Sequence, residues 1–211
     1  MRYTVLGATG GTGQQLVRQA LDAGHQVTAV VRNPDRLPVH HERLEKVTAE
    51  VTEPEALRPV FAGRDAVLSA LGAPGNKAAG IASRAAPAVL GALSAEGVRR
   101  YVAVSAPPVG PPPEGEGPLG RFVVWPLVSW VFRDVYADLR LMERAVRASD
   151  TDWTLVHPPR LTDRPLTGDY RLRIGGAVPR GRTVPRADVA HAVLGLVDDP
   201  ATYRRVVGVA S

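Results

Sequence analysis

Residues 7–13 read Gly-Ala-Thr-Gly-Gly-Thr-Gly and follow a short apolar run, residues 2–6 (RYTVL), which we expect to form a strand. A glycine-rich turn that leaves a strand and opens a helix is typical of dinucleotide-binding sites, because free backbone amides at the helix N-terminus face the pyrophosphate. In such a turn Gly7 permits the tight bend, Gly10 lets the backbone approach the anion, and Gly13 lets the helix pack closely on the strand. The stretch, with GxxGxxG spacing, therefore predicts a nucleotide site after the first strand.

Outward from this turn, strand-like and helix-like segments alternate along most of the chain. Nearly continuous apolar strands separated by helices predict a parallel sheet covered on both faces. With right-handed crossovers this is the doubly wound α/β arrangement, the Rossmann fold. A length of 211 residues suits a single NAD(P)-binding domain, residues 1–211. The expected strands are 26–31, 44–47, 65–70, 101–104, 153–156, 170–174 and 205–209, and the expected helices are 11–23, 54–61, 77–95, 126–149 and 188–197.

Two segments interrupt the alternation. Residues 106–125 are crowded with proline and glycine, so we expect a loop or lid there. It is not expected to be a linker between domains, because the α/β pattern resumes after it. Residues 158–186 are expected to be largely irregular and to form a small C-terminal subregion on the substrate side.

The composition excludes several kinds of chemistry. The chain contains no cysteine, which excludes disulfides, thiolate catalysis and cysteine-ligated metal centres. His40 and His41 lie in a polar loop without further ligands, so we expect no metal site. The longest apolar run, residues 122–132, is too short to span a bilayer, and no secretory signal precedes the first strand. We therefore expect a cytoplasmic protein without stable membrane insertion.

The positive charge is concentrated in one segment. The net charge is +5, from 26 basic and 21 acidic residues. Residues 160–186 contain seven arginines and two aspartates, and this local excess equals that of the whole chain. Sparse aromatic residues and the lack of a basic helical stripe argue against a nucleic-acid partner. The segment is either a solvated arginine-rich surface or a positive field beside the site of an anionic ligand.

The residues after the second expected strand indicate which dinucleotide is bound. NAD-preferring sites usually place an acidic residue there, which accepts hydrogen bonds from the ribose 2′-hydroxyl. This chain has Arg32 instead, and Arg36 follows four residues later. A guanidinium pairs well with a 2′-phosphate, whereas the alternative is two exposed loop arginines without such a role. We therefore predict NADP(H) as the cofactor.

A set of motifs extends from the first turn to the last expected helix. These motifs are GATGGTG at 7–13, VTAVVRNPDRL at 27–37, DAVLSALG at 65–72, VAVSA at 102–106, DWTLVHPPRLTDRPLTGDYR at 152–171 and VPRADVAHAVL at 184–194. Through them the chain resembles the atypical short-chain dehydrogenase/reductase superfamily. The most similar groups are the NAD(P)H-binding proteins around biliverdin reductase B, also called flavin reductase, and their NmrA-like relatives.

The resemblance implies how a bound dinucleotide would be held. The implied contacts are Gly7, Thr9, Gly10, Gly11, Thr12 and Gly13 to the pyrophosphate, Arg32 and Arg36 to the 2′-phosphate, Glu50 and Val51 to the adenine, Leu71 and Gly72 to the ribose, Ser105 beside the nicotinamide, and Pro158 and Pro159 along the nicotinamide pocket.

Typical members of the superfamily use a Tyr–Lys pair for catalysis, and this chain departs from that pattern. Tyr136 and Arg140 form a YxxxR sequence, but the family's usual positions coincide with Val135 and Leu139, about 100° away around the helix. We therefore expect a structural Tyr136 and a salt-bridging Arg140. Hydride transfer can then proceed by positioning, with water as the proton source. Ser105, the catalytic candidate, would hydrogen-bond the nicotinamide amide or the acceptor, and no histidine base for it is evident.

The acceptor side of the site is indicated by an arginine and by an apolar segment. Arg160 stands where biliverdin reductase B has a histidine, which argues against specific tetrapyrrole reduction and puts a cation at the pocket mouth. The preceding His157 is expected to be a packed residue. Residues 122–132 are a buried helix start, an acceptor-binding wall, a dimer face or a shallow membrane contact, and Trp125 and Trp130 could stack on a flat acceptor.

These observations favour an NADPH-dependent oxidoreductase, similar to flavin reductase, that transfers hydride to a flat, conjugated acceptor such as a flavin, a quinone or a tetrapyrrole-like molecule. The basic segment suggests that this small-molecule partner is anionic. The alternative is a non-catalytic, NmrA-like protein that senses NADP(H) or assists assembly. We expect a monomer or a homodimer.

Overall fold

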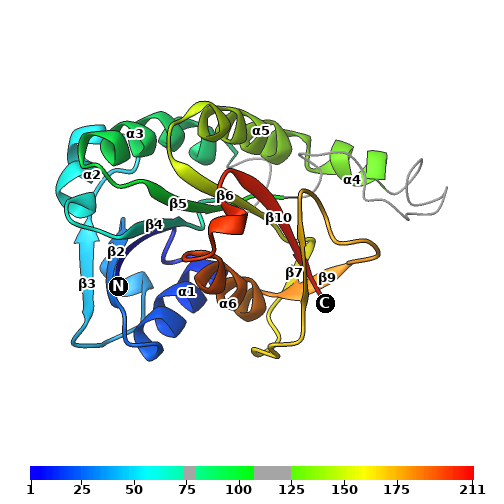
Figure 1. Ribbon diagram of the computed structural model, residues 1–211, viewed down its shortest axis with the longest axis horizontal. Coiled ribbons are helices and arrows are strands. Elements are labelled where there is room, and N and C mark those ends of the chain that lie inside the picture. The colour runs from blue at the N-terminus through cyan, green and yellow to red at the C-terminus, as the bar shows by residue number, and fades with distance from the viewer. Residues whose placement is uncertain (74–78, 107–124) are drawn as a thin grey trace.

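The computed structural model describes residues 1–73, 79–106 and 125–211 of the chain. In these residues a large sheet is covered by helices on both faces, and a second, two-stranded sheet lies near the C-terminal end (Figure 1). The strands in chain order are β1 (Arg2–Leu6), β2 (Gln26–Val31), β3 (Leu44–Thr48), β4 (Ala66–Ser69), β5 (Arg100–Val104), β6 (Asp152–His157), β7 (Arg160–Thr162), β8 (Arg171–Ile174), β9 (Thr183–Pro185) and β10 (Arg205–Ala210).

The large sheet has the strand order β3-β2-β1-β4-β5-β6-β10-β8. Its strands run parallel except for β8, which pairs antiparallel with β10 at the edge. The predicted doubly wound α/β fold is therefore confirmed. β1 lies between β2 and β4. The chain therefore runs from β1 outward to β2 and β3, and then crosses back to form β4 on the other side of β1. Ligands of doubly wound folds bind at such a switch point, outside the carboxyl ends of the strands.

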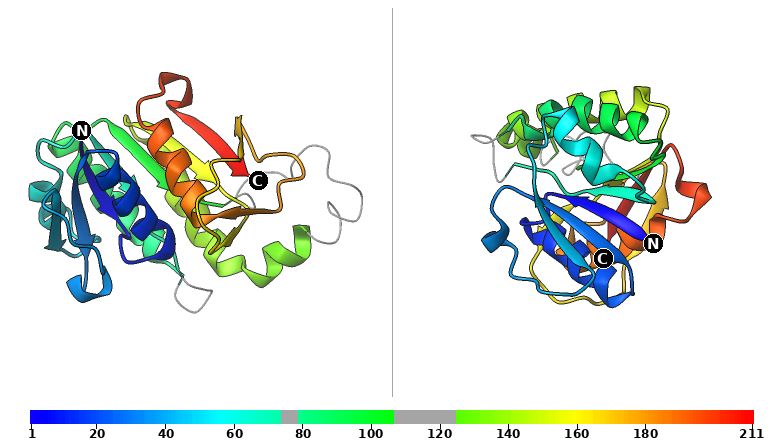
Figure 2. Two further views of the ribbon diagram at one scale, coloured as in Figure 1. Left: turned by 90° about the horizontal axis from the view of Figure 1, so that it is seen from below. Right: turned by 90° about the vertical axis from the view of Figure 1, so that its left-hand side faces the viewer.

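The helices form two layers, as Figures 1 and 2 show. Two of them pack side by side on one face of the sheet, three cover the opposite face, and one short helix lies beyond the end of the second layer. The first pair is α1 (Gly11–Asp22) and α6 (Arg186–Leu196), the second layer is α2 (Pro54–Phe61), α3 (Ile81–Ala95) and α5 (Arg133–Ala148), and the short helix is α4 (Trp125–Val131).

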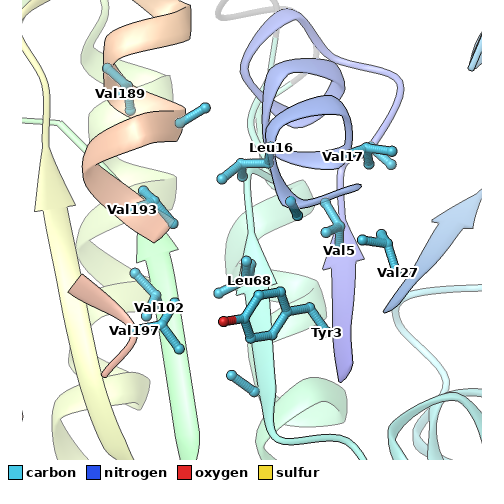
Figure 3. Close-up of a cluster of buried hydrophobic side chains, with 14 of the residues drawn as sticks. Tyr3, Val5, Leu16, Val17, Val27, Leu68, Val102, Val189, Val193 and Val197 are labelled. Carbon is cyan, nitrogen blue, oxygen red and sulfur yellow. The ribbon is translucent and has the colours of Figure 1, made fainter. Parts of the chain in front are cut away.

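Buried apolar side chains fill the space on both sides of the sheet. Beneath α1 and α6, Leu16 and Val193 pack with Val5 and Leu68 of the strands (Figure 3). A second cluster on the opposite face includes Phe61 of α2. Each large side chain buried in this way contributes about 1.5–3 kcal/mol. These clusters hold the strands firmly, and the strand ends carry the candidate site.

The helix predicted over residues 126–149 is instead two helices, α4 and α5, separated at Phe132. Hydrogen bonds from Phe132 N to Val128 O (3.1 Å) and from Tyr136 N to Phe132 O (3.0 Å) continue across the junction. The apolar spacing therefore predicted the helical residues correctly but missed the change of direction. The physical reason is that α5 packs against α3 and the sheet, whereas α4 lies beyond them.

The segment 158–186, expected to be largely irregular apart from a strand at 170–174, contains that strand as β8 (Arg171–Ile174) and two further short strands, β7 and β9. β7 and β9 pair in parallel as the two-stranded sheet. Strands of three residues leave little periodicity in a sequence, and their pairing depends on segments more than twenty residues apart. The predicted helix over 77–95 begins later, at Ile81, and residues 74–78 lie outside the described part of the chain. The predicted lid at 106–125 falls largely on residues 107–124, which the structure likewise does not describe.

The start of α3 is held by a residue of α5. Gly80 occupies the N-cap position of α3, and glycine has no side chain that could accept hydrogen bonds from the first amides of the helix. Asp138 accepts hydrogen bonds from Ala82 N (3.2 Å) and Ser83 N (2.8 Å) in its place. Burial alone would raise the pKa of Asp138, but hydrogen bonds from the Ser83 side chain and from backbone amides outweigh it and lower the pKa.

We expect Asp138→Asn to lower the free energy of unfolding by about 1 kcal/mol at neutral pH, the usual contribution of a capping side chain. Because the folded-state pKa is lowered, the stabilisation is present above the ordinary carboxyl pKa and is lost as the pH falls through the folded value. Urea unfolding at neutral pH and at about pH 3 should therefore show a smaller acid-induced loss in the variant than in the native protein. Asp134→Asn, an exposed change in the same helix, is the control, and an equal acid effect in both variants would contradict the assignment.

Candidate functional site

The glycine-rich turn lies at the carboxyl end of β1, at the switch point of the sheet. Gly7 has a φ of +73°, and a Cβ atom there would lie 2.5 Å from Ala70 O at the end of β4. A Cβ atom on Gly13 would lie 2.1 Å from Gly7 O. Side chains at either position would collide with backbone, which cannot move as a flexible side chain can. The turn is therefore a close-packed cradle that requires glycine at both positions.

The first turn of α1 has the properties of an anion site. Gly10 occupies the N-cap position without a side-chain hydrogen bond, and the first turn contains no acidic residue. Gly10 N donates to Gly7 O (3.0 Å), and Gln14 Nε2 donates to Thr9 O (3.1 Å), which fixes the shape of the turn. Backbone amides at a helix N-terminus carry a partial positive charge. These residues, together with the exposed Gly11 and the buried Thr12, fit a pyrophosphate.

Arg32 and Arg36 follow β2, the strand that neighbours β1 in the sheet. The register pairs Leu6 with Val30, so Arg32 leaves β2 at the edge where the glycine-rich turn leaves β1. Both arginine side chains are exposed. The Asn33 side chain accepts a hydrogen bond from Asp35 N (2.9 Å) and holds the 3₁₀ turn Pro34–Arg36 in shape. The structure thus leaves two guanidinium groups accessible at the sheet edge that carries the glycine-rich turn.

The residues assigned to the adenine and the ribose follow β3 and β4 at the same edge. Val51 and Leu71 are half-buried and pack against the second core cluster. The Glu50 carboxylate accepts hydrogen bonds from Thr52 N (3.3 Å) and Thr52 Oγ1 (3.0 Å), so it already has partners within its own loop. A Cβ atom on Gly72 would have no heavy atom within 4 Å, so close packing does not require glycine there.

Ser105, Glu143 and His157 form a buried cluster at the carboxyl ends of β5 and β6. Ser105 Oγ donates to Glu143 Oε1 (2.6 Å), and His157 Nε2 lies 2.6 Å from the same oxygen. Arg147 donates to Glu143 Oε2 at 3.0 Å. The exposed fractions of Ser105, Glu143 and His157 are 7%, 3% and 4%. Ser105 N also donates to Val156 O (2.8 Å), which ties the end of β5 to β6.

The electrostatics of this cluster determine what Ser105 can do. Burial alone would raise the pKa of Glu143, but hydrogen bonds from His157, Ser105 and Arg147 outweigh it and lower the pKa. An ionised carboxylate only accepts hydrogen bonds, so the single proton of Ser105 Oγ points toward Glu143. The Ser105 oxygen is therefore an acceptor toward any other group. His157 is packed, as expected, but it shares a carboxylate with Ser105 rather than contacting the serine.

Glu143 was not singled out from the sequence, although a signal for it exists. It lies on the same helical face as Leu139, Met142 and Val146, all of which are buried. An acidic residue within an otherwise apolar helical stripe implies a buried partner, because an isolated charge is rarely buried. The sequence does not say which residues supply that partner.

Tyr136 is packed into α5 beside Phe132. Its side chain is half-buried, its ring centroid lies 6.0 Å from that of Phe132, and burial raises the pKa of its hydroxyl. The exposed Arg140 follows Tyr136 by one helical turn, and the structural role expected for Tyr136 stays a prediction.

The residues assigned to the acceptor side stand on separate elements. Pro158 is buried and Pro159 half-buried after β6, and Arg160 opens β7 with an exposed side chain. Trp130 on α4 is 67% exposed, and Trp125 begins that helix. Leu127, Val131 and Phe132 are exposed as well, which excludes a buried helix start for the described part of residues 122–132.

Asp188 anchors the loop that contains residues 165–168 (PLTG). This residue lies in the first turn of α6 and is fully buried. Its carboxylate accepts hydrogen bonds from Thr167 N (2.8 Å), Thr167 Oγ1 (2.6 Å) and Gly168 N (3.0 Å). The motif therefore fastens its loop to α6, which packs beside α1.

Within the described residues we find no helix long and apolar enough to cross a membrane. The same residues contain no group of three or more His, Cys, Asp or Glu side chains placed to hold a metal ion.

A model of a protein family described as NAD(P)H-binding matches residues 7–200. The match confirms the predicted cofactor class and the resemblance to NAD(P)H-binding oxidoreductases. Among curated proteins, the photosystem II assembly factor Ycf39 of Synechocystis sp. is 39% identical over 71 residues, which are 33% of this chain and 22% of that protein. The aligned part of the chain thus spans about a fifth of the length of this relative.

Solved structures from several bacteria share the fold over the whole chain. A short-chain dehydrogenase/reductase from Veillonella parvula in complex with NADP has a TM-score of 0.78 and 23% identity, with 100% of this chain and 94% of that chain covered. ChuY, an anaerobillin reductase from Escherichia coli O157:H7, has a TM-score of 0.78 and 20% identity, with 100% and 97% covered.

Proposed function

We propose that this chain, which belongs to the NAD(P)H-binding protein family, is an NADPH-dependent reductase of a flat, conjugated acceptor such as a flavin, a quinone or a tetrapyrrole-like molecule. The observation that carries the proposal is the close-packed glycine cradle at the switch point, with Arg32 where NAD sites place an acid. The family match supports the cofactor class, and the preference for NADPH and the acceptor are our inference.

The chain's own residues would bind the dinucleotide in the following way. The amides of the first turn of α1 would hold the pyrophosphate, and Arg32 and Arg36 would hold the 2′-phosphate. Backbone of Leu71 and Gly72 would lie along the ribose. When bound, NADPH supplies the hydride, and the protein supplies position and electrostatics.

Ser105 would orient the nicotinamide as a hydrogen-bond acceptor. Its proton is directed to Glu143 Oε1, so its oxygen is available to the N–H groups of a carboxamide. Tyr136 lies one residue out of phase with the family's usual tyrosine position, so we do not assign it as the proton donor of the reduced acceptor. A conjugated acceptor can take that proton from water, which is why such acceptors suit this site better than alcohols or ketones do.

Two observations bear on the class of acceptor. Arg160 is exposed directly after the paired prolines and would present a permanent cation to an acidic acceptor. ChuY, which shares the fold, is named an anaerobillin reductase, and this name adds weight to a tetrapyrrole-like acceptor despite the arginine. Flavins and quinones remain equal members of the series to be tested.

We expect Arg32→Ala to weaken NADPH binding about 10- to 100-fold, because a charge-assisted hydrogen bond to phosphate is lost. Binding of NADH, which lacks the 2′-phosphate, should change less than about twofold. Fluorescence titration of both dinucleotides measures the effect, with the exposed Arg144→Ala in α5 as control. Tighter native binding of NADH than of NADPH would overturn the assigned preference.

The catalytic proposal is tested by NADPH oxidation with FMN, a quinone series and biliverdin. Turnover with at least one acceptor is expected, and kcat/KM for anionic acceptors should fall with added salt because the field of the basic segment is screened. Tight NADPH binding without turnover on any of them would argue against a reductase.

A cofactor-sensing assembly protein is the second candidate, favoured by the local similarity to Ycf39. The exposed apolar side chains of α4, Leu127, Trp130 and Val131, suit a partner surface. This function predicts similar affinity for NADPH and NADP⁺, together with a protein partner whose binding depends on the dinucleotide.

A further inference from the structure

Arg186, the first residue of α6, reaches across to the glycine-rich turn. A Cβ atom on Gly11 would lie 2.6 Å from Arg186 Cδ and 3.0 Å from its Nε. The arginine stem therefore lies directly against the first residue of α1. This contact follows from the side-by-side packing of α1 and α6, which Figures 1 and 3 show.

An anion beside Arg186 would be stabilised both by its guanidinium and by the N-terminus of α1. The first turn of α1 carries the positive end of a helix dipole and no acidic side chain. The guanidinium of Arg186 adds a full positive charge beside this partial positive charge. Gly10 and Gly11 are exposed, so an anion can approach both groups from solvent.

Asp163, the acidic partner of Arg186, forms only a weak ion pair with it. Arg186 Nη1 lies 2.5 Å from Asp163 Oδ1, yet the Asp163 side chain is 88% exposed and that of Arg186 is 30% exposed. An ion pair with one partner in solvent contributes little, because water and salt screen it. A phosphate oxygen at the turn can therefore replace the Asp163 carboxylate.

We propose that Arg186 is a cofactor-binding residue that contacts the pyrophosphate, and that Asp163 holds its guanidinium in place until the dinucleotide binds. The inference rests on the proposed cofactor site and adds to it a side chain from the opposite end of the chain. Arg32 and Arg36 follow β2, whereas Arg186 adjoins the first turn of α1, so the two sets of arginines serve different phosphates.

NADPH and NADH both contain the pyrophosphate, but only NADPH contains the 2′-phosphate, so the two dinucleotides distinguish the roles of Arg186 and Arg32. Fluorescence titration with NADPH and with NADH should show that Arg186→Met weakens both by the same factor, about tenfold or more. Arg32→Ala should weaken only NADPH. Arg186→Lys should recover part of the affinity because it keeps the charge, and Arg164→Met, an exposed arginine of the same segment, should bind as the native protein does.

Asp163→Asn separates a binding role of Arg186 from a structural one. If Asp163 only holds the guanidinium, this variant should bind both dinucleotides at least as tightly as the native protein. A loss equal to that of Arg186→Met would mean that the ion pair shapes the turn, and it would overturn the proposal. Urea unfolding of each variant establishes that it is folded before its affinity is compared.

The failure of this inference differs from the failure of the proposed function. A native protein that binds neither dinucleotide would defeat both. A native protein that binds them, with Arg186→Met unchanged or weakened for NADPH alone, would defeat only the role given to Arg186.

Discussion

Gly13→Ala is expected to abolish most dinucleotide binding and to destabilise the protein. The added Cβ atom would lie 2.1 Å from Gly7 O, 2.8 Å from Gly7 C and 2.9 Å from the Ala8 Cα, all of them backbone atoms. The first turn of α1 must therefore move away from the end of β1. Overpacking of this kind costs about 1–3 kcal/mol. Hydrogen bonds to a charged group contribute about 1.5–3 kcal/mol each, so loss of even one amide contact to the pyrophosphate should weaken NADPH binding about 10- to 100-fold.

Urea unfolding and fluorescence titration with NADPH measure the two effects. The matched control is Gly91→Ala in α3, where a Cβ atom would have no heavy atom within 4 Å. This change should leave affinity unaltered and raise stability by about 0.5–1 kcal/mol, because alanine is the better helix former. Native affinity in Gly13→Ala would show that the close packing of the turn is not what forms the site.

Glu143→Ala is the second substitution with a large expected effect. It removes the acceptor shared by Ser105 and His157, both of which are buried, and leaves their polar atoms without that partner. Removing one member of a buried, hydrogen-bonded pair costs about 3–5 kcal/mol. Arg147 contributes less to this loss, because its side chain is 45% exposed and can turn to water.

Chemical unfolding of three variants grades the effect. Glu143→Gln keeps an acceptor oxygen and should lose less stability than Glu143→Ala. Ser105→Ala removes a single donor and should cost about 1 kcal/mol. Arg144→Ala, on the exposed side of the same helix, should stay within about 0.5 kcal/mol of the native protein. If Glu143→Ala were no more costly than Arg144→Ala, the carboxylate would not hold this part of the structure together.

The elements that were predicted well depend on short-range information. The strand expected over 65–70 spans Ala66–Ser69, and the helix expected over 54–61 has those bounds. In each case a run of apolar residues, bounded by glycine, proline or charged residues, restricts the local backbone to one regular conformation. The same holds for the glycine-rich turn, where the required backbone conformation is available to few other residues.

The elements that were missed depend on contacts between distant segments. The junction at Phe132 follows from where α3 and the sheet end, and the pairing of β7 with β9 joins residues more than twenty positions apart. The N-terminus of α3 is capped by Asp138, more than fifty residues away. Composition and periodicity carry no information about such pairings.

The amino-acid sequence by itself determined the doubly wound class of the fold and the place of the nucleotide turn, because apolar periodicity and glycine are local restrictions on the backbone. Only the tertiary structure decided that Ser105 shares Glu143 with His157 and that Arg186 lies against Gly11. These groups come from segments far apart in the chain. They meet because parallel strands end at a common edge and because α1 and α6 pack on the same face of the sheet.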